Sequence, residues 1–441
     1  MGLGSLTVGH GNLLRHSAVG CRVSKPLTVV VVSDLHATSR QPGDAAGSWL
    51  TTTTPRTPTD HPLIGLKKYL GDHPSDIDLI LCAGDICDQA DETALLMAWT
   101  DLVSIAESAG AQLIATAGNH DLDSRHQGDL DPRGVLYDLE PPFPSLDASI
   151  RDQYWAKNFA IVDGPALESD GDELAWRVVT VNSSAFHGYV SEEGPELSHG
   201  RVSPRTTRRL ATELGRRLSA RINILLIHHH LEQLPNVDLK EQSRIRDGEQ
   251  LAELLEATSP WIVIHGHKHR ARILFVHGEG SSATVFAAGS LSAYPYGQVA
   301  AAGISNQAYI LSFAEEEVLE EHQLGIAGQF ETIAWKPDRG WRLANMDLGL
   351  PGHGGFGWRA DIKRLANRLA RALKDTSETK LSLAEILACE PKVRFLSPAG
   401  IEALKLALEK RTPPIVLTRT EHGLIDYISA TLPVPVDDNE G

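Results

Sequence analysis

The sequence predicts an α/β fold that carries a metal site at the edge of its β-sheets. Five short apolar runs of strand type each end in a polar segment that contains aspartate, asparagine or histidine. Apolar runs that end in glycine and polar residues are typical of buried strands that deliver side chains at their carboxyl ends. A folded sheet would therefore bring five distant polar segments to one edge.

The five runs and the polar residues behind them keep one order along the chain. They are residues 29–32 before Asp34 and His36, residues 79–83 before Asp85 and Asp88, residues 113–117 before Asn119, His120 and Asp121, residues 224–227 before His228, and residues 261–264 before His267 and His269. Carboxylate, amide and imidazole groups are all metal ligands. The pattern thus predicts a hydrolytic centre that holds two metal ions.

These segments resemble the calcineurin-like metallophosphoesterase superfamily. Its pattern is DxH, then GDxxD, then GNHD or GNHE, then a histidine after a strand, then GHxH, and residues 25–315 contain all five in order. One such motif is a weak signal, because DxH or GHxH occurs by chance in many chains, but the ordered series is specific. The resemblance implies a central β-sandwich flanked by helices, a dimetal site at the sheet edge, and a metal-dependent phosphoesterase activity.

The resemblance also implies a metal ligand set. Two cations about 3.5–4 Å apart need an anionic bridge, and in the family the aspartate of GDxxD contacts both ions, which assigns the bridge to Asp85. The remaining predicted ligands are Asp34, His36 and His269 for one ion, and Asn119, His228 and His267 for the other. This mixed donor set favours Mn, Fe or Zn over Mg or Ca.

By the same resemblance, His120 lies near the substrate and is not a metal ligand. An imidazole titrates near neutral pH, so it can stabilise developing charge or protonate the leaving oxygen. Asp121 is predicted to fix the orientation of His120, and Asp88 is a second candidate for that role. In the run His228-His229-His230 one imidazole is needed as a ligand, and His228, the first past the strand, is the preferred one.

Among relatives, the chain most resembles the bacterial cyclic-nucleotide phosphodiesterase branch. That branch implies a small nucleotide-like diester as substrate and in-line attack by a metal-bridging hydroxide. Protein phosphatases usually show GDxxDRG and GNHE, whereas Gln89 and Ala90 follow Asp88 here and Asp121 replaces the glutamate. A phosphomonoesterase, a nuclease and a non-catalytic nucleotide sensor remain as alternatives. A formal net charge of −16 argues against a broad electrostatic grip on nucleic acid.

Composition places the protein in the cytoplasm, without a membrane partner. Its four cysteines, Cys21, Cys82, Cys87 and Cys389, show no paired zinc spacing, which favours reduced thiols. No segment reaches the roughly 18 apolar residues that span a bilayer. The first 24 residues lack the apolar middle of a secretory signal.

The predicted organisation is a flexible lead at residues 1–24, the metallophosphoesterase domain at residues 25–315, and a mainly helical accessory region at residues 316–441. Helices are expected at residues 92–109, 204–220, 247–257, 360–374 and 398–410, a glycine-rich linker at residues 349–357, and a disordered acidic end at residues 437–440. The helix at residues 360–374 is basic and amphipathic, and is interpreted as a surface helix in preference to a phosphate-binding one. Partner docking, self-association and active-site capping are all open for the accessory region.

Overall fold

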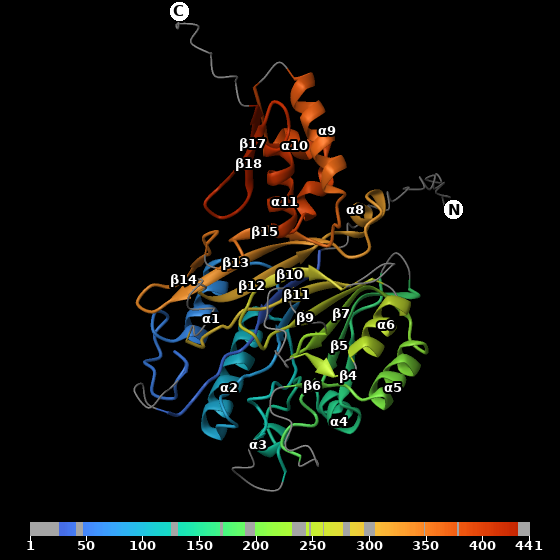
Figure 1. Ribbon diagram of the computed structural model, residues 1–441. Coiled ribbons are helices and arrows are strands. Elements are labelled where there is room, and N and C mark those ends of the chain that lie inside the picture. The colour runs from blue at the N-terminus through green and yellow to red at the C-terminus, as the bar shows by residue number, and fades with distance from the viewer. Residues whose placement is uncertain are drawn as a thin grey trace, which may run out of the picture.

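The computed structural model describes residues 26–40, 47–124, 131–167, 171–189, 199–231, 244–246, 248–258, 260–276, 283–294, 305–347, 349–376 and 379–430. The predicted flexible lead and acidic end lie outside the described residues. Within these ranges, two β-sheets pack face to face with helices outside them, and a smaller unit follows at the C-terminal end (Figure 1). No helix of the described chain is long and apolar enough to cross a membrane.

The first sheet has the strand order β14-β13-β12-β1-β2-β3, and β15 also pairs with β13. Its strands are β1 (Thr28–Val32), β2 (Leu79–Cys82), β3 (Gln112–Ala115), β12 (Asn306–Phe313), β13 (Gly328–Lys336), β14 (Gly340–Leu343) and β15 (His353–Phe356). β1, β2 and β3 are parallel, so their carboxyl ends share one edge. Helices α1 (Pro62–Asp72) and α2 (Glu92–Ala109) belong to this half.

The second sheet has the order β10-β11-β9-β7-β5-β4. Its strands are β4 (Phe159–Asp163), β5 (Glu173–Val181), β7 (Ser219–Ile227), β9 (Trp261–His265), β10 (Arg272–Phe275) and β11 (Thr284–Ala287). β5, β7, β9 and β11 are parallel. The accompanying elements are α3 (Gly134–Tyr137), α4 (Ala148–Lys157), α5 (Pro204–Leu214), α6 (Gly248–Thr258), and the short pair β6 (Gly200–Arg201) and β8 (Ile245–Arg246).

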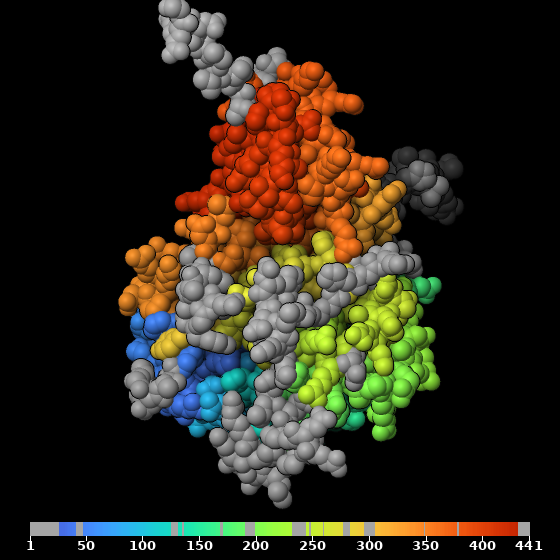
Figure 2. Space-filling view, viewed as in Figure 1, coloured from blue at the N-terminus to red at the C-terminus, as the bar shows by residue number. Residues whose placement is uncertain are grey.

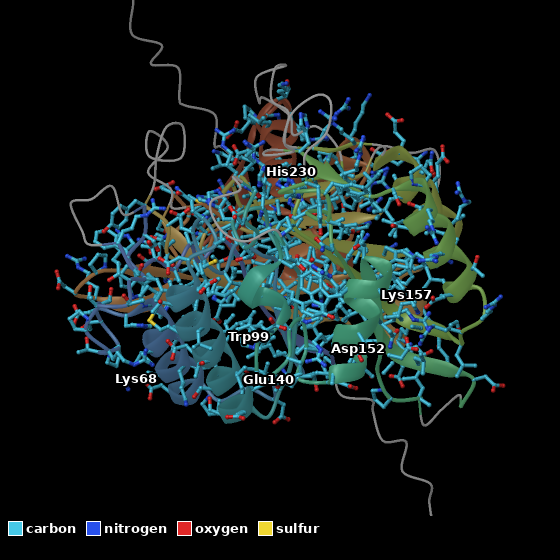
Figure 3. The ribbon with its side chains drawn as sticks, turned by 90° about the horizontal axis from the view of Figure 1, so that it is seen from below. Lys68, Trp99, Glu140, Asp152, Lys157 and His230 are labelled. Atoms are coloured by element: carbon cyan, nitrogen blue, oxygen red, sulfur yellow. The ribbon has the colours of Figure 1, made fainter. Side chains whose placement is uncertain are left out.

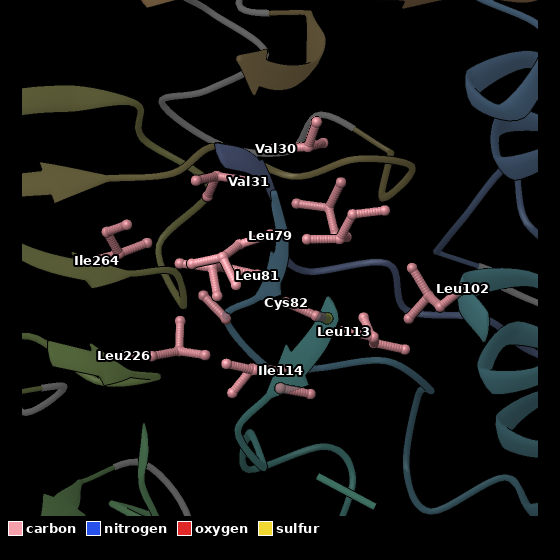
Figure 4. Packing of buried hydrophobic residues seen from close by; sticks show 14 of the residues in the cluster. Val30, Val31, Leu79, Leu81, Cys82, Leu102, Leu113, Ile114, Leu226 and Ile264 are labelled. Carbon is pink, nitrogen blue, oxygen red and sulfur yellow. The ribbon is translucent and has the colours of Figure 1, made fainter. Parts of the chain in front are cut away.

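Strand β7 shows how one sequence serves two cores. Ile224 and Leu226 face the first sheet and belong to the core between the sheets, whereas Leu225 and Ile227 face outward and pack with the helix residues of the second core. Successive strand residues point to opposite faces, so a fully apolar run is required where both faces are covered. Figure 4 shows Leu226 and Ile264 of the second sheet approaching residues of β2 and β3.

The predicted α/β fold is confirmed, and so are the strands that precede the metal motifs and the helix at residues 92–109. The helix predicted at residues 204–220 is too long. It ends at Leu214, where Gly215 caps it with a backbone N–H bond to Ala211, and β7 already begins at Ser219. The last two residues are extended because β7 pairs with β5 from Ser219 onward.

The predicted boundary at residue 315 falls inside the first sheet. β12 and β13 pair over eight residues on either side of it, with α8 (Glu316–Glu321) between them. The glycine-rich segment predicted as a linker instead forms β15. A side chain at Gly354 would meet the Phe330 ring at 2.5 Å, and one at Gly355 would overlap the Arg394 carbonyl, so these glycines permit close packing. We propose a division after Phe356 in place of residue 315.

The C-terminal unit follows a helix, strand, helix, helix, hairpin order. It consists of α9 (Ile362–Asp375), β16 (Lys380–Ser382), α10 (Leu383–Cys389), the 3-10 helix η1 (Pro391–Phe395), α11 (Pro398–Glu409), β17 (Ile415–Arg419) and β18 (Ile425–Ala430). The apolar stripe of α9 packs in a core of its own with Leu404 and Ile428, which confirms the interpretation of α9 as a surface helix. The unit lies beyond β13 and β15 (Figure 1), and the space-filling view shows it in red and orange projecting from the body (Figure 2).

Candidate metal centre

The predicted ligands sit on loops with an unusual backbone. Ten non-glycine residues of the described chain have a positive φ angle, and five of them are the predicted ligands Asp34, His36, Asp85, His267 and His269. A side chain disfavours this left-handed conformation, and residues held in it cluster at functional sites. The backbone is therefore strained where the carboxylates and imidazoles converge.

Two motif glycines make this convergence possible. A Cβ atom at Gly118 would overlap Oδ1 of Asp85, and one at Gly266 would overlap Oγ of Ser33 and Oδ2 of Asp34. Contacts under 3.0 Å are sterically excluded, so only glycine lets these loops approach the carboxylates. The glycines of GNHD and GHxH are thus required sterically by the close approach of the loops.

Asp85 lies at the centre of the site, and its two oxygens face different groups. Oδ1 accepts a hydrogen bond from the His120 backbone N–H at 2.8 Å. Oδ2 lies 3.5 Å from Nε2 of His36 and 3.3 Å from Nε2 of His228. A single buried oxygen therefore stands between imidazoles from two predicted ligand groups.

The first predicted group, Asp34, His36 and His269, is brought together. Nε2 of His36 and Nε2 of His269 lie 3.1 Å apart, and Oδ1 of Asp34 is 3.4 Å from Nε2 of His269. Ser33 donates a hydrogen bond to Oδ2 of Asp34 at 2.6 Å, which leaves Oδ1 turned toward the imidazoles. All three ligand residues are buried, and their donor atoms are close enough together to hold one ion.

The second predicted group, Asn119, His228 and His267, also meets. Nε2 of His228 lies 3.2 Å from Oδ1 of Asn119 and 3.2 Å from Nδ1 of His267. Nδ1 of His228 is hydrogen-bonded to the Ala83 carbonyl at 2.7 Å, so the other ring nitrogen is the one presented to the site. A backbone bond that fixes the imidazole tautomer is typical of metal-binding histidines.

The electrostatics of this edge suit a cation. Burial alone would raise the pKa of the Asp85 carboxyl, but the imidazoles of His228 and His120 hold that pKa well below its usual range. Burial alone would lower the pKa of His228, yet the Asp85 carboxylate raises it to about 9. The buried carboxylate thus favours positive charge beside it, and a divalent ion would supply that charge. The donor set and its field fit two such ions.

Asp88, not Asp121, makes the hydrogen bond to the His120 ring. Nδ1 of His120 lies 2.7 Å from Oδ1 of Asp88. Both oxygens of Asp121 instead accept backbone hydrogen bonds, from Cys87 at 2.9 Å and Gly118 at 2.9 Å. The orienting role predicted first for Asp121 is therefore corrected: Asp121 ties the GDxxD loop to the GNHD loop, and burial together with the Asp85 carboxylate raises its pKa to about 6.

The other two histidines of the triplet point elsewhere. Nδ1 of His229 bonds to the Ser183 hydroxyl at 2.8 Å, and Nδ1 of His230 lies 3.1 Å from Nδ1 of His265. His229 nevertheless groups with His228 and His267 as a possible ligand set. Nε2 of both His229 and His267 is buried without a hydrogen-bond partner among the described residues. His228 as the ligand of the triplet remains a prediction.

His187, which belongs to none of the sequence motifs, lies at the side of this cluster. Its ring is 5.4 Å from that of His229, and its Nε2 is hydrogen-bonded to the His199 carbonyl at 2.7 Å. Burial lowers the pKa of His187 to about 4, so the ring is neutral. It follows β5 without a recognisable pattern around it, which leaves no sequence signal for its place beside the site.

Comparison with family models gives two matches. The model for calcineurin-like phosphoesterases matches residues 27–271, more than half of the 441 residues. A second model, wHTH-Calcineurin_assc, matches residues 354–410, which cover most of the C-terminal unit. No curated protein matches the chain.

Several solved structures are similar at low identity. A purple acid phosphatase, PPD1, from yellow lupin (Lupinus luteus) seeds has 14% identity and a TM-score of 0.41, with 70% of this chain and 52% of that one covered. A 5'-nucleotidase precursor from Thermus thermophilus has 14% identity and a TM-score of 0.32, with 66% and 51% covered. The phosphopantetheinyl hydrolase PptH from Mycobacterium tuberculosis has 14% identity and a TM-score of 0.31, with 61% and 91% covered.

The chain thus spans about half the length of the first two solved structures. Family membership rests instead on the part of this chain that the family model matches. That part, residues 27–271, contains every predicted ligand from Asp34 to His269. The match over residues 354–410 covers α9, β16, α10, η1 and α11, and it ends before the β17–β18 hairpin. The chain belongs to the calcineurin-like phosphoesterase family and carries a winged helix-turn-helix type unit at its C-terminal end.

Proposed function

We propose that the protein is a dimetal phosphohydrolase that cleaves a small nucleotide-like phosphodiester. One observation carries the proposal. Oδ2 of Asp85 lies within 3.5 Å of Nε2 of His36 on one side and within 3.3 Å of Nε2 of His228 on the other. A shared carboxylate oxygen between two ligand groups is what a two-ion phosphoesterase requires.

In this scheme Asp34, His36 and His269 would hold one ion, Asn119, His228 and His267 would hold the other, and the Asp85 carboxylate would be shared between the two groups. Mn, Fe and Zn are the proposed metals, because imidazole, amide and carboxylate donors suit them. When bound, two such ions lower the pKa of water and neutralise charge on the phosphoryl oxygens. The protein's own part is to orient these donors, through Ser33 on Asp34 and the Ala83 carbonyl on His228.

His120 is the proposed general acid. Its Nδ1 bonds to Asp88, so its Nε2 is the atom that can carry a proton to the leaving oxygen. The side chain is 24% exposed, whereas the predicted ligand His228 is fully buried, which suits contact with an incoming substrate. Asp88 acts through His120 and is a positioning residue.

The choice of a diester rests on the sequence motifs, which resemble the cyclic-nucleotide phosphodiesterase branch. A phosphomonoesterase or a nuclease would use the same metal centre. A nucleotide sensor would bind metals and ligand without turnover, and would pass the signal to the winged-helix unit. In that scheme the C-terminal unit docks a protein partner or a second copy of the chain.

A cytoplasmic location is part of the proposal. Cys82 and Cys87 are buried free thiols, and Cys389 is a free thiol on the surface. Burial raises the pKa of Cys82 and of Cys87, so both are unreactive apolar groups of the core. Free thiols are typical of reducing compartments.

The test is hydrolysis of bis-p-nitrophenyl phosphate against p-nitrophenyl phosphate with added manganese. We expect faster cleavage of the diester, and loss of that cleavage in Asp85→Asn and His120→Ala. Preference for the monoester would replace the diesterase with a phosphatase. Two bound metals without turnover on these substrates or on nucleotides, but with ligand-induced stabilisation, would support the sensor instead.

A further inference from the structure

A basic hollow lies between α4 and α5, outside the metal centre. It has a volume of about 590 Å³ and is lined by Lys157, Arg205, Arg208, Arg209 and Arg216, with Glu213 as the one acidic lining residue. All four arginines are exposed. Lys157, which lines the hollow, lies toward the right in Figure 3, whereas His230 of the histidine triplet lies nearer the middle.

Among the described residues, only part of the positive charge of this hollow is compensated. Glu213 accepts a hydrogen bond from Lys157 at 2.8 Å, which neutralises that pair. Within the described part of the chain, Arg205, Arg208, Arg209 and Arg216 form no ion pair, whereas the neighbouring Arg217 bonds to Asp163 at 2.5 Å. Four arginines without an acidic partner in the described ranges, on a chain of formal net charge −16, are the kind of local basic surface that attracts a polyanion.

The arginines run along the helix and just past its end. α5 rises about 1.5 Å per residue, so the nine steps from Arg205 to its end at Leu214 cover about 13.5 Å, and Arg216 lies two residues further on. Phosphates recur about every 3.4 Å along one strand of a duplex, so a row of this length passes several of them. The large apolar side chains of α5, Leu210 and Leu214, are buried in the second core. The exposed face of the helix therefore offers no apolar centre for a protein partner.

The row begins beside the metal edge. A Cβ atom at Gly200 would lie 2.6 Å from Cβ of His229, so the strand that leads into α5 packs against the histidine triplet. Arg201, the next residue, donates its backbone N–H to the Ser183 carbonyl and stacks its guanidinium on the Phe186 ring at 5.2 Å. Arg205, the first arginine of the row, follows Arg201 four residues later.

We propose that the α5 arginine row binds the phosphate backbone of a nucleic-acid strand. Arginine matches phosphate with paired N–H donors, and backbone contact of this kind is independent of sequence. The proposal goes beyond hydrolysis of a small diester, because it concerns a surface outside the metal centre and is measured by binding alone. It qualifies the expectation drawn from net charge, since a locally basic face exists on an acidic chain.

The experiment is fluorescence anisotropy with labelled oligonucleotides of about 20 nucleotides, longer than the roughly 4–16 nucleotides that single-strand-binding folds cover. Single-stranded and duplex probes form separate arms. Full-length Asp85→Asn protein is used so that cleavage cannot consume the probe. The row is reversed by R205E, R208E and R209E together. A matched control reverses Lys336, Arg339 and Arg342, which are exposed on the β13–β14 hairpin, outside the winged-helix unit. Thermal melts verify that both variants fold.

We expect the α5 variant to lose affinity by about tenfold or more, and the slope of log K against log salt to become shallower by about 2 to 3 units, one phosphate contact per arginine. The β13–β14 variant, with the same change in net charge, should bind the probes with nearly the affinity of the Asp85→Asn parent. Equal losses of affinity in both variants would mean that binding depends on net charge alone, and would overturn the proposal. So would an absence of binding to either probe by the parent protein.

Binding and hydrolysis fail independently in this design. If the parent binds oligonucleotides through α5 but the wild-type protein cleaves no bis-p-nitrophenyl phosphate, the metal-centre proposal fails and the surface stands. If the wild-type protein cleaves the small diester but the parent binds no oligonucleotide, the surface proposal fails and the metal centre stands.

Discussion

The two ends of the second sheet both bury charged side chains, but they compensate them differently. At the amino ends of β5 and β7, Arg177 bonds to Asp163 at 2.6 Å, and Arg221 pairs with Glu173 at 3.3 Å and Glu316 at 2.5 Å. Each of these cations has an anionic partner. At the carboxyl ends, the histidines that follow β7 and β9 meet Asp34 and Asp85 from the loops of the first sheet. The only ionisable partners of these two carboxylates among the described residues are imidazoles, and Nε2 of His267 has no hydrogen-bond partner there.

The way the buried charges are compensated distinguishes an ion-pair network that stabilises the fold from a candidate metal centre. A hollow of about 590 Å³ lies at the compensated end, so cavity size does not mark the chemistry. What distinguishes the carboxyl-end edge is the combination of buried carboxylates, imidazole nitrogens of His229 and His267 without a hydrogen-bond partner among the described residues, and five predicted ligands with a positive φ angle. Metal ions would stabilise these features at the carboxyl-end edge.

The largest effect is expected from Asp85→Asn. An amide in place of the shared carboxylate removes the negative charge that both ligand groups face, so bound metal and turnover should fall together. We expect turnover to drop by more than about 10⁴-fold, since enzymes supply rate enhancements of about 10⁶ or more and the metal centre carries most of this one. Metal content by mass spectrometry and hydrolysis rates are measured on the same samples; full metal occupancy with normal turnover would contradict the bridge.

His120→Ala should come next, with a drop of about 10²–10⁴-fold in kcat, the usual range for a general acid. Metal content should stay at the wild-type level, because this imidazole bonds to Asp88 and is not in either predicted ligand group. A substrate with a better leaving group should narrow the loss. An unchanged rate on a poor leaving group would remove the assigned role.

Asp88→Asn should lower turnover by about 10–100-fold, in the range seen when a hydrogen-bond partner of a site residue is lost. The carboxylate holds Nδ1 of His120, so its effect should vanish in a His120→Ala background. A double-mutant cycle on kcat measures this coupling. Additive losses would mean that Asp88 acts separately from His120.

Removal of metal should lower the stability of the wild-type protein and leave the stability of Asp85→Asn unchanged. An ion at 100 times its Kd stabilises the native state by about 2.7 kcal/mol. Thermal melts with and without a chelator should therefore differ for wild type and nearly coincide for the variant. Equal shifts in both proteins would place the stabilising metal somewhere other than Asp85.

The smallest functional effect is expected at the compensated end. Arg177→Met removes a buried guanidinium that bonds to Asp163 and to the Leu218 carbonyl, and should cost about 1–3 kcal/mol of unfolding free energy. Metal content and kcat should not change, because Arg177 serves the fold alone. Denaturant unfolding and turnover measure the two quantities, and a loss of turnover without a loss of stability would break the contrast between the two ends.

The metal edge could be predicted from the sequence because strand periodicity and ligand type are local properties. A run such as residues 29–32 has the pattern of a buried strand, and Asp34 must then follow it at the carboxyl end. Parallel pairing of β1, β2 and β3 carries the first three motifs to one edge without further information. The family pattern supplied the ligand assignment.

Side-chain directions within the loops were not predictable in the same way. Asp121 is adjacent to His120 in the chain, yet Asp88 reaches the imidazole from 32 residues away. Basic helices show the same limit. On α9 the Arg368 guanidinium pairs with Glu390 of a different element, whereas no acid reaches Arg205, Arg208 or Arg209 from the described residues around α5. Which arginines are paired with acids depends on the tertiary fold. Sequence composition alone therefore singled out α9, and not α5, as the basic helix.

The most direct test of the dimetal account is titration of metal-free protein with manganese while bis-p-nitrophenyl phosphate hydrolysis and bound metal are followed together. We predict that turnover rises only as the second ion binds, and that Asp85→Asn shows neither the second ion nor the rise. Full turnover of metal-free protein, or no turnover on any phosphoester with two ions bound, would contradict the account.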